Sequence, residues 1–300
     1  MSRPLQLLIF SDGKPGHRNQ SLGLAEALAR LTPTQTRTIE LGDFPYGKKI
    51  SHSASIIRNG PRPDWIIATG HGTHACALLM SRKFHCRSIV LMKPSWPRFL
   101  FDACLIPAHD LIKKSTGPNV IPTSGALNRI VATSQKQPIG TILIGGESRD
   151  FGCDPETLRV AISDITRSSA LNWHITDSRR SPAGFLTSLS HLPAILHPHQ
   201  QTATDWLPQQ LGVSETVWVT CESVSMIYEA LSSGARVGLL PMPARQASSK
   251  IQSAIEQLHR EGHITPFAEF QSKGIMKSSA PLAEADRCAK ILLEKFPLPL

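Results

Sequence analysis

Polar side chains gather in a glycine-bearing loop near the start of the chain. Residues 11–21 read SDGKPGHRNQS and follow the apolar run 5–10. Backbone N–H groups at Gly13 and Gly16 would face the positive end of the following helix, a place that suits phosphate or sugar hydroxyls. The spacing is neither a P-loop nor a GxGxxG fingerprint, and a tight turn with an asparagine cap is the alternative. The polar residues concerned are Asp12, Lys14, His17, Asn19 and Gln20.

Two adjacent arginines follow a strand-like run in the second half of the chain. Arg179 and Arg180 come directly after residues 172–176. Guanidinium groups bind phosphate oxygens in a bidentate way, so the pair suits a diphosphate, and the alternative is a solvated charge pair on a loop. Gly145 and Gly146 repeat the glycine-loop design of the first half after another apolar run.

A strand followed closely by a helix is expected where the chain reads VTCESVSMIYEA, residues 219–230. The hydroxyls of Ser223 and Ser225 would lie at the N-terminus of that helix, where an anion is stabilised. Glu229 follows one to two turns later, near enough to reach ribose hydroxyls. The alternative is an ordinary capped helix with a surface glutamate.

Histidines are numerous, with 12 in the chain. His109 beside Asp110, after the apolar run 103–106, is either an acid–base group or a helix cap. No HExxH motif occurs, and His71 and His74 sit in a loop-like context. We therefore expect no metal site.

These loops need elements that hold them, and the chain supplies such elements in two successive series. Buried strands are expected at residues 5–10, 65–69, 88–92, 103–106, 141–144, 172–176, 217–220 and 237–240. Helices are expected at residues 20–31, 75–80, 155–167, 223–232, 248–260 and 282–296. This alternation predicts an α/β fold with two doubly wound parallel sheets. Ligands of such sheets bind beyond the carboxyl ends of the strands, where these loops lie.

A polar segment divides the two series. Residues 131–138 (VATSQKQP) resemble a linker, so the expected domains are residues 1–132 and 138–300, with the last helix closing the second. Residues 1–130 hold 17 Lys and Arg against 7 Asp and Glu, whereas the remainder holds 15 against 16. The excess predicts a polyanionic partner for the first domain, and its alternative is a general solubility charge.

Composition excludes several classes of protein. A hydrophobic fraction of 41% excludes wholesale disorder, and an aromatic fraction of 6% without a basic–aromatic stripe argues against nucleic-acid binding. No run approaches the roughly 20 apolar residues of a transmembrane segment, and polar residues follow the first apolar run too early for a secretory signal. Six scattered cysteines without a CxxC pair fit reduced thiols, so we expect a cytoplasmic protein.

Eight segments together resemble the elongated-mitochondria fission family, a set of plant proteins and their bacterial relatives. The resemblance covers nearly the whole chain. The segments read SDGKPGHRNQSLGLAEAL, ATGHGTH, VLMKPSWP, IPAHD, GALNRI, LIGGES, ITDSRRSP and VTCESVSMIYEA. The chain departs from the family pattern at three places, which are Cys221-Glu222-Ser223 in place of an Asp-Ser pair, His71-Gly72 in place of an arginine-bearing stretch, and Arg18 in place of an acidic residue.

The resemblance implies a GT-B-like fold, in which two Rossmann-like domains face a cleft. For bacterial members it implies a metal-independent glycosyltransferase that moves a sugar from a nucleotide sugar to a phosphorylated or lipid-linked glycan. Plant members act instead as adaptors that recruit a dynamin-like GTPase to mitochondria. The alternatives are therefore a GT-B-like nucleotide-sugar epimerase and a non-catalytic adaptor. An anionic lipid-linked acceptor would bring the protein to the periphery of the inner membrane.

By the same resemblance, the second domain binds the nucleotide-sugar donor. Glu229 would bind the ribose, and Arg179 or Arg180 would neutralise the leaving group, which removes the need for a metal. Backbone N–H groups would bind the diphosphate at Ser225, Met226 and the Gly145-Gly146 loop.

The first domain, by this resemblance, takes the acceptor. His17 is the candidate general base, with Asp12 or His109 as rivals. The other expected ligand contacts of this loop are Gly13, Lys14, Gly16 and Asn19.

Overall fold

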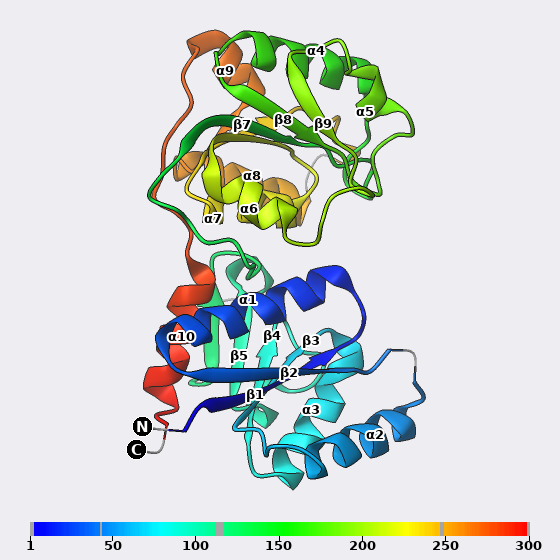
Figure 1. Cartoon of the computed structure of the whole chain (residues 1–300), viewed down its shortest axis with the longest axis vertical. Coiled ribbons are helices and arrows are strands. Elements are labelled where there is room, and N and C mark those ends of the chain that lie inside the picture. Colours follow the sequence, from blue (N-terminus) through cyan, green and yellow to red (C-terminus); the bar gives the residue numbers. More distant parts are fainter. Residues whose placement is uncertain (1–2, 43, 112–116, 247–248, 299–300) are drawn as a thin grey trace. The chain divides into compact units, whose positions relative to one another are not determined.

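The computed structural model of the chain describes residues 3–42, 44–111, 117–246 and 249–298. The chain forms two compact units, each built around a six-stranded sheet (Figure 1). The first unit comprises Met1–Arg129 and Ala283–Leu300, and the second comprises Ile130–Leu282. All strand pairs within the two sheets are parallel, which confirms the expected α/β fold with two doubly wound sheets.

The sheet of the first unit has the strand order β2-β1-β3-β4-β5-β6. Its strands are β1 (Leu5–Ser11), β2 (Thr34–Glu40), β3 (Trp65–Thr69), β4 (Arg87–Leu91), β5 (Ala103–Pro107) and β6 (Val120–Thr123). Its helices are α1 (Pro15–Leu31), α2 (Tyr46–Arg58), α3 (His71–Lys83) and α10 (Glu284–Lys295), with 3₁₀ turns η1 (Arg98–Leu100) and η2 (Ala108–Asp110). Along β1, Leu7 and Ile9 join the core on one face and Leu8 and Phe10 the core on the other. Both faces are covered, which explains the continuous apolar run.

The second unit repeats the design with the strand order β12-β11-β10-β7-β8-β9. Its strands are β7 (Gln137–Leu143), β8 (Asn172–Thr176), β9 (Ala194–His197), β10 (Ser214–Thr220), β11 (Arg236–Leu240) and β12 (Ile264–Pro266). Its helices are α4 (Pro155–Arg167), α5 (Phe185–Ser188), α6 (Trp206–Val213), α7 (Val224–Ser232), α8 (Lys250–Arg260) and α9 (Phe267–Lys273). Ile142 and Leu143 of β7 point into separate cores on the two faces of the sheet.

The four strands that the sequence analysis missed are the four strands at the sheet edges: β2, β6, β9 and β12. In β2 only Ile39 is buried, and the other six residues of the strand are exposed or half-exposed. An edge strand is covered on fewer sides than a central one, so its sequence lacks the continuous apolar run by which the central strands were recognised.

The last helix belongs to the first unit, not to the second domain in which the sequence analysis placed it. Helix α10 lies beside α1, where Cys288 and Leu292 are fully buried in the same core as Leu24 and other residues of α1 (Figure 1). Arg30 of α1 also pairs with Asp286 at 2.6 Å. An amphipathic pattern shows that a helix has one buried face but not which core covers that face.

The expected linker begins without regular secondary structure, but β7 starts at Gln137, inside the segment assigned to the linker. Lys136 connects this segment to the rest of the second unit, because its Nζ donates to the backbone carbonyls of Gly212 at 2.8 Å and Ser233 at 2.6 Å. Burial lowers the pKa of this ammonium group.

Within the described residues, no helix combines the length and the apolar character that crossing a bilayer requires.

We expect Leu292→Ala to destabilise the first unit by about 3 kcal/mol, because it removes a fully buried side chain from the contact between α10 and α1. Hydrogen exchange should become faster in β1 and β3 and stay unchanged in β7 and β10. The exposed neighbour Lys290 provides the control, since Lys290→Ala removes no buried surface. Faster exchange in β7 and β10 alone would show that α10 supports the second unit.

Candidate functional site

Each sheet contains one point at which the strand order reverses. In the first unit β1 is flanked by β2 and β3, and in the second unit β7 is flanked by β8 and β10. The loops that leave two such strands turn to opposite faces of the sheet, and open α/β sheets bind ligands in the space between them, beyond the carboxyl ends. The loops after β1 and β3, and those after β7 and β10, are therefore the candidate site of each unit.

Asp12 and His17 form a hydrogen-bonded pair at the switch point of the first unit. His17 Nδ1 lies 2.9 Å and 3.1 Å from the two carboxylate oxygens of Asp12. The Asp12 side chain is 9% exposed and that of His17 is 25% exposed, so a fixed carboxylate orients a more accessible imidazole. When Nδ1–H donates to Asp12, Nε2 can accept a proton. Asp12 and His17, expected as rivals for the role of general base, are hydrogen-bonded partners in the structure.

Gly70, directly after β3, makes room for this pair. Its φ is +92°, and a Cβ at this position would lie 2.5 Å from His17 Nδ1 and 2.6 Å from Asp12 Oδ2. Any side chain here would therefore displace the imidazole or the carboxylate. The ATGHGTH segment pointed to this loop, but sequence alone could not show what the glycine faces.

Helix α1 begins at Pro15, five residues earlier than expected, so part of the predicted loop is helical. Gly16 lies in its first turn, and the backbone N–H groups of Gly13 and Lys14 donate at 3.2 Å to Ser11 Oγ and Asp12 Oδ1. The Gly13 amide, which was expected to face a ligand, is therefore engaged within the unit, as is that of Lys14. The residues expected in the loop but found on the helix include Gly16, His17 and Asn19.

His74, which the sequence analysis did not assign to the site, is buried beside it in the second turn of α3. Its Nδ1 accepts from the backbone N–H of Ser95 at 3.4 Å, and its buried Nε2 has no hydrogen-bond partner among the described residues. Burial, together with the electrostatic effect of the nearby His71 and His17, lowers the pKa of His74 to about 4. The ring is therefore neutral at physiological pH. His71 and His74 both reach Ser95 Oγ, which joins the loop after β4 to α3.

His109 lies in η2 after β5, and its side chain lies outside the described part of the structure. β5 is the third strand from β1 in the sheet order, about 14 Å away across the sheet. The backbone positions therefore do not bring His109 to the Asp12–His17 pair.

Glu222 occupies the switch point of the second unit, and its side chain is fully buried at the end of β10. Its Oε1 accepts from the backbone N–H of Gly146 at 3.1 Å, while that of Gly145 donates to Thr220 Oγ1 at 2.8 Å. Both amides that were expected to bind a diphosphate are therefore engaged within the unit in this structure, and their contact with a diphosphate stays a prediction. A Cβ at Gly145 would overlap Glu222 Oε1, so glycine is required here by packing.

The second carboxylate oxygen of Glu222 differs from the first in its surroundings. Oε2 is buried and accepts no hydrogen bond from the described residues. Burial raises the pKa of this carboxyl group and outweighs the opposing hydrogen bonds from Thr220 and the Gly146 amide and the charge of Arg180. A buried acceptor without a donor is costly. It marks a place where a ligand donor or a bound water would be stabilised.

Arg179 and Arg180 differ in how far their charge is already neutralised. Arg180 Nη2 lies 3.2 Å from Glu222 Oε1, and its side chain is 45% exposed. Arg179 is exposed and makes no ion pair with any described residue. Of the two, Arg179 has more of its charge and more of its donors available for an added phosphate.

The N-terminus of α7 follows Glu222 directly. Ser223 occupies the N-cap position, yet its hydroxyl accepts no hydrogen bond from the first turn. The leading amide groups of a helix have no partner within the helix, so those of Ser225 and Met226 can serve an anion. Ser225 is exposed, Met226 is half-buried, and Glu229 lies half-buried one turn further along.

Among the residues that the structure describes, no three His, Cys, Asp or Glu side chains lie close enough together to hold a metal ion.

Sequence comparison identifies relatives of the whole chain. A family model for mitochondrial fission ELM1 matches residues 15–296. An uncharacterized protein of Rickettsia prowazekii (strain Madrid E) is 24% identical over 354 residues, an alignment that covers 98% of this chain and 99% of that protein.

Solved structures with a similar fold include proteins of the GT-B type. A Listeria monocytogenes protein assigned as a UDP-N-acetylglucosamine 2-epimerase is similar with a TM-score of 0.61 and 12% identity, covering 97% of this chain and 95% of that one. Acinetobacter baumannii MurG is similar with a TM-score of 0.53 and 10% identity, covering 97% and 100%. These similarities confirm the GT-B-like combination of two Rossmann-like domains.

We expect His74 to make stability depend on pH between about 6.5 and 4. Its pKa is lower in the folded protein, about 4, than the ordinary 6.5. As pH falls through this window the unfolded chain takes up the proton first, so the free energy of unfolding decreases. Between pH 7 and pH 5 this group should account for about 2 kcal/mol.

Urea unfolding of the wild type and of His74→Leu at pH 7 and pH 5 measures this contribution. The variant should lose about 2 kcal/mol less than the wild type on acidification. His191→Leu, at an exposed position of the second unit, serves as the control and should keep the wild-type difference. An equal loss in His74→Leu and the wild type would contradict the assignment.

Proposed function

We propose that this chain, which belongs to the mitochondrial fission ELM1 family, transfers a sugar from a nucleotide-sugar donor to a phosphorylated or lipid-linked glycan without a metal ion. The second unit would bind the donor and the first unit the acceptor. The GT-B-like fold supports the general class, because the solved structures that share it include glycosyltransferases and an epimerase of nucleotide sugars.

The observation that carries the proposal is the Asp12–His17 pair. A carboxylate that holds Nδ1 of an imidazole fixes both its tautomer and its orientation, which is how a general base is commonly prepared. His17 would use Nε2 to accept the proton of the acceptor hydroxyl. Asp12 would then stabilise the imidazolium that forms, at a distance of 2.9 Å.

The proposed donor site combines the N-terminus of α7 with Arg179. The amides of Ser225 and Met226 would bind the diphosphate at the positive end of the helix. Arg179 would neutralise the charge that develops on the leaving nucleoside diphosphate, the role that a metal ion has in other transferases. Glu229, one turn further along, would bind the ribose hydroxyls.

In the proposed reaction the acceptor oxygen attacks the anomeric carbon, and its proton passes to His17 Nε2. The bond between the anomeric carbon and the diphosphate oxygen breaks, and the electron pair leaves with the nucleoside diphosphate. The uncapped α7 N-terminus is fixed before reaction, so its dipoles need no reorganisation as the charge develops.

The charge of the first unit supports an anionic acceptor. This unit holds 20 Lys and Arg against 10 Asp and Glu, so essentially all of the net charge of the chain lies in it. An anionic lipid-linked acceptor at the inner surface of a membrane, with the protein in the cytoplasm and peripheral to it, agrees with this excess.

Two other functions remain alternatives. A nucleotide-sugar epimerase would convert the donor without any acceptor, and an adaptor would bind a protein partner and turn over no donor. Incubation with the donor alone, followed by separation of the sugars, distinguishes the epimerase. Absence of donor binding as well as turnover would favour the adaptor.

We expect Arg179→Ala to weaken the binding of a nucleoside diphosphate by about tenfold, because a charge-assisted contact to phosphate is lost. A thermal-shift screen of nucleoside diphosphates, with and without Mg²⁺, identifies the base, and calorimetry then gives Kd. Arg167→Ala serves as the control. Arg167 is exposed at the C-terminus of α4, the end of the helix that lies away from the carboxyl edge of the sheet, so its removal should leave Kd unchanged.

Glu229→Ala provides a second reading of the same site. It should weaken the binding of the nucleoside and of the nucleoside diphosphate, whereas Arg179→Ala should weaken the binding of the nucleoside diphosphate alone. No thermal shift with any nucleoside diphosphate, in the presence or absence of Mg²⁺, would contradict the proposed donor site.

We expect His17→Ala to lower kcat by about 10²- to 10⁴-fold, because general-base assistance is lost. Asp12→Asn should lower kcat by at least about tenfold, because the imidazole is no longer oriented. Neither variant should change donor affinity, since both lie in the first unit. Full turnover by His17→Ala would remove the base assignment.

A further inference from the structure

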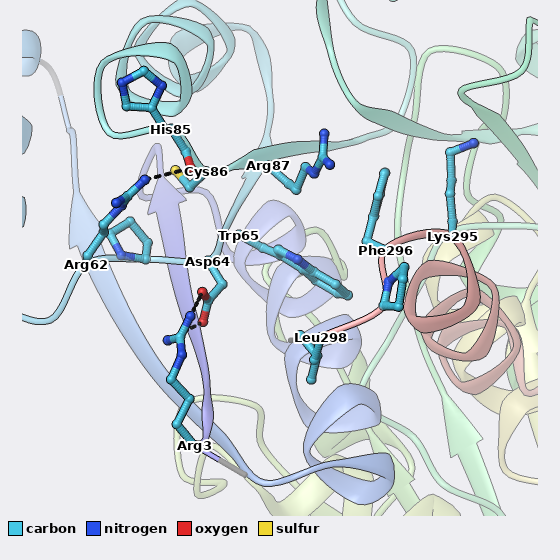
Figure 2. Close-up of a pocket in the computed structure, with 12 residues that line it drawn as sticks. Arg3, Arg62, Asp64, Trp65, His85, Cys86, Arg87, Lys295, Phe296 and Leu298 are labelled. Carbon is cyan, nitrogen blue, oxygen red and sulfur yellow. Dashed lines mark hydrogen bonds and ion pairs between the residues drawn. The ribbon is translucent and has the colours of Figure 1, made fainter. Parts of the chain in front are cut away.

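A pocket of about 860 Å³ opens at the amino edge of the first unit's sheet (Figure 2). Its walls come from the chain before β1, from the starts of β3 and β4 with the residues that precede them, and from the end of α10 with the residues that follow it. Parallel strands all start at this edge, so the pocket lies at the opposite end of the sheet from Asp12 and His17. The five-residue strand β3 alone separates the two edges by about 16 Å. A ligand in this pocket would therefore not contact the Asp12–His17 pair.

Four Lys and Arg side chains line this pocket, and two of them form no ion pair with an acid in the described part of the chain. Arg3 pairs with Asp64 at 2.6 Å, and Arg87 donates to Asp102 at 2.9 Å. Arg62 and Lys295 hydrogen-bond only to backbone carbonyls among the described residues. Carbonyl groups orient a cation but do not neutralise it. The pocket therefore keeps an excess positive charge in the unit that carries the net charge of the chain.

Arg62 is held in place with one edge of its guanidinium available. Its Nε donates to the carbonyl of Phe84 at 2.7 Å and its Nη2 to that of His85 at 3.0 Å. These two bonds fix the plane of the group, while Nη1 has no partner among the described residues. A guanidinium that is already oriented loses little conformational freedom when it binds a phosphate.

Lys295 reaches the pocket from the last turn of α10. Its Nζ donates to the carbonyl of Pro118 at 2.7 Å, which leaves two of its three hydrogens for other acceptors. Phe296 lies between this ammonium group and Arg87, 5.9 Å from the first and 5.1 Å from the second (Figure 2). The ring thus keeps two cations near each other without an acid between them.

The size and the apolar walls of the pocket indicate more than a bare anion. A volume of 860 Å³ falls in the range of small-molecule sites and far exceeds what one phosphate needs. Pro63, Pro297 and Leu298 line it beside the cations, so an organic group attached to the phosphate would find apolar contacts.

We propose that this amino-edge pocket binds a phosphate group that carries an organic substituent, through Arg62, Lys295 and the accessible faces of Arg3 and Arg87. The ligand is neither the donor nor the acceptor of the reaction at the carboxyl edge. It anchors or regulates the first unit from the opposite end of its sheet.

Calorimetric titration of the full chain with inorganic pyrophosphate at low salt tests this site. All variants carry Arg179→Ala, which weakens the proposed donor site of the second unit and so lowers its share of the pyrophosphate binding. Arg62→Gln combined with Lys295→Gln should weaken binding by at least about tenfold, because two charge-assisted contacts are lost. Arg58→Gln combined with Lys290→Gln removes the same charge at residues outside the pocket lining and should change Kd less than twofold.

The proposal would be overturned if the Arg62→Gln/Lys295→Gln variant and the Arg58→Gln/Lys290→Gln variant bound pyrophosphate with equal affinity, whether or not that affinity is lower than in the parent protein. Arg62→Lys combined with Lys295→Arg guards against a folding defect, because it keeps both charges. This variant should bind pyrophosphate more tightly than the double glutamine variant, and equal weakness in the two would also count against the proposal.

Vesicles distinguish a lipid headgroup from a soluble phosphorylated compound. Phe99, which is 80% exposed, lines a neighbouring hollow that shares His85 and Cys86 with this pocket, and an exposed aromatic beside cations suits an interface with lipid. Sedimentation with phosphatidylglycerol vesicles that requires Arg62 and Lys295, and that pyrophosphate reverses, would identify the lipid headgroup. Pyrophosphate binding without sedimentation would identify a soluble ligand.

Discussion

Parallel pairing on both sides of one central strand is the constraint from which the candidate sites of this protein follow. β1 lies between β2 and β3, and β7 lies between β8 and β10, so consecutive connections must cross to opposite faces of each sheet. At the carboxyl edge, the loops that follow the two strands of each switch point turn to opposite faces of the sheet, so the backbone leaves room for side chains or a ligand between them. In both units, the polar groups that meet at this edge come from the two strands of the switch point: Asp12 faces Gly70, and Glu222 faces Gly146.

Glycine at these meeting points is a consequence of the same constraint. At Gly145 the buried carboxylate of Glu222 occupies the space of a side chain, and at Gly70 the imidazole of His17 does so. The two glycines therefore accept close approach by a neighbouring side chain, which differs from offering amides to a phosphate. Of the two places where a diphosphate contact was expected in the second unit, the N-terminus of α7 is therefore the one favoured here, because its first turn receives no side-chain cap.

Sequence reasoning predicted the central strands of both sheets, because burial on two faces leaves a continuous apolar run, and the bounds of β3 and β8 agree with those expected. It missed the edge strands, which carry a weaker form of the same signal, and it assigned α10 to the wrong unit, because amphipathicity does not identify the partner surface. The loops that hold the candidate groups were found, since each follows a recognisable strand. The pairing of Asp12 with His17, the burial of Glu222 and the orphaned nitrogen of His74 depend on contacts between distant segments, which no local pattern records.

The buried polar groups also bear on whether the chain is an enzyme or only a scaffold. Among the described residues, neither the buried Oε2 of Glu222 nor the buried Nε2 of His74 has a hydrogen-bond partner. Each arrangement costs stability, and an apolar side chain of similar size would avoid that cost. Both groups lie at the switch points and not in the remote parts of the cores. A protein that served only as a binding surface for a partner would gain nothing from desolvated polar atoms at these two positions. A site that binds and polarises a ligand, in contrast, needs polar groups that can still form hydrogen bonds with the reactants. The position of these destabilising polar groups at the switch points therefore favours a binding or catalytic role for the carboxyl edges of both sheets.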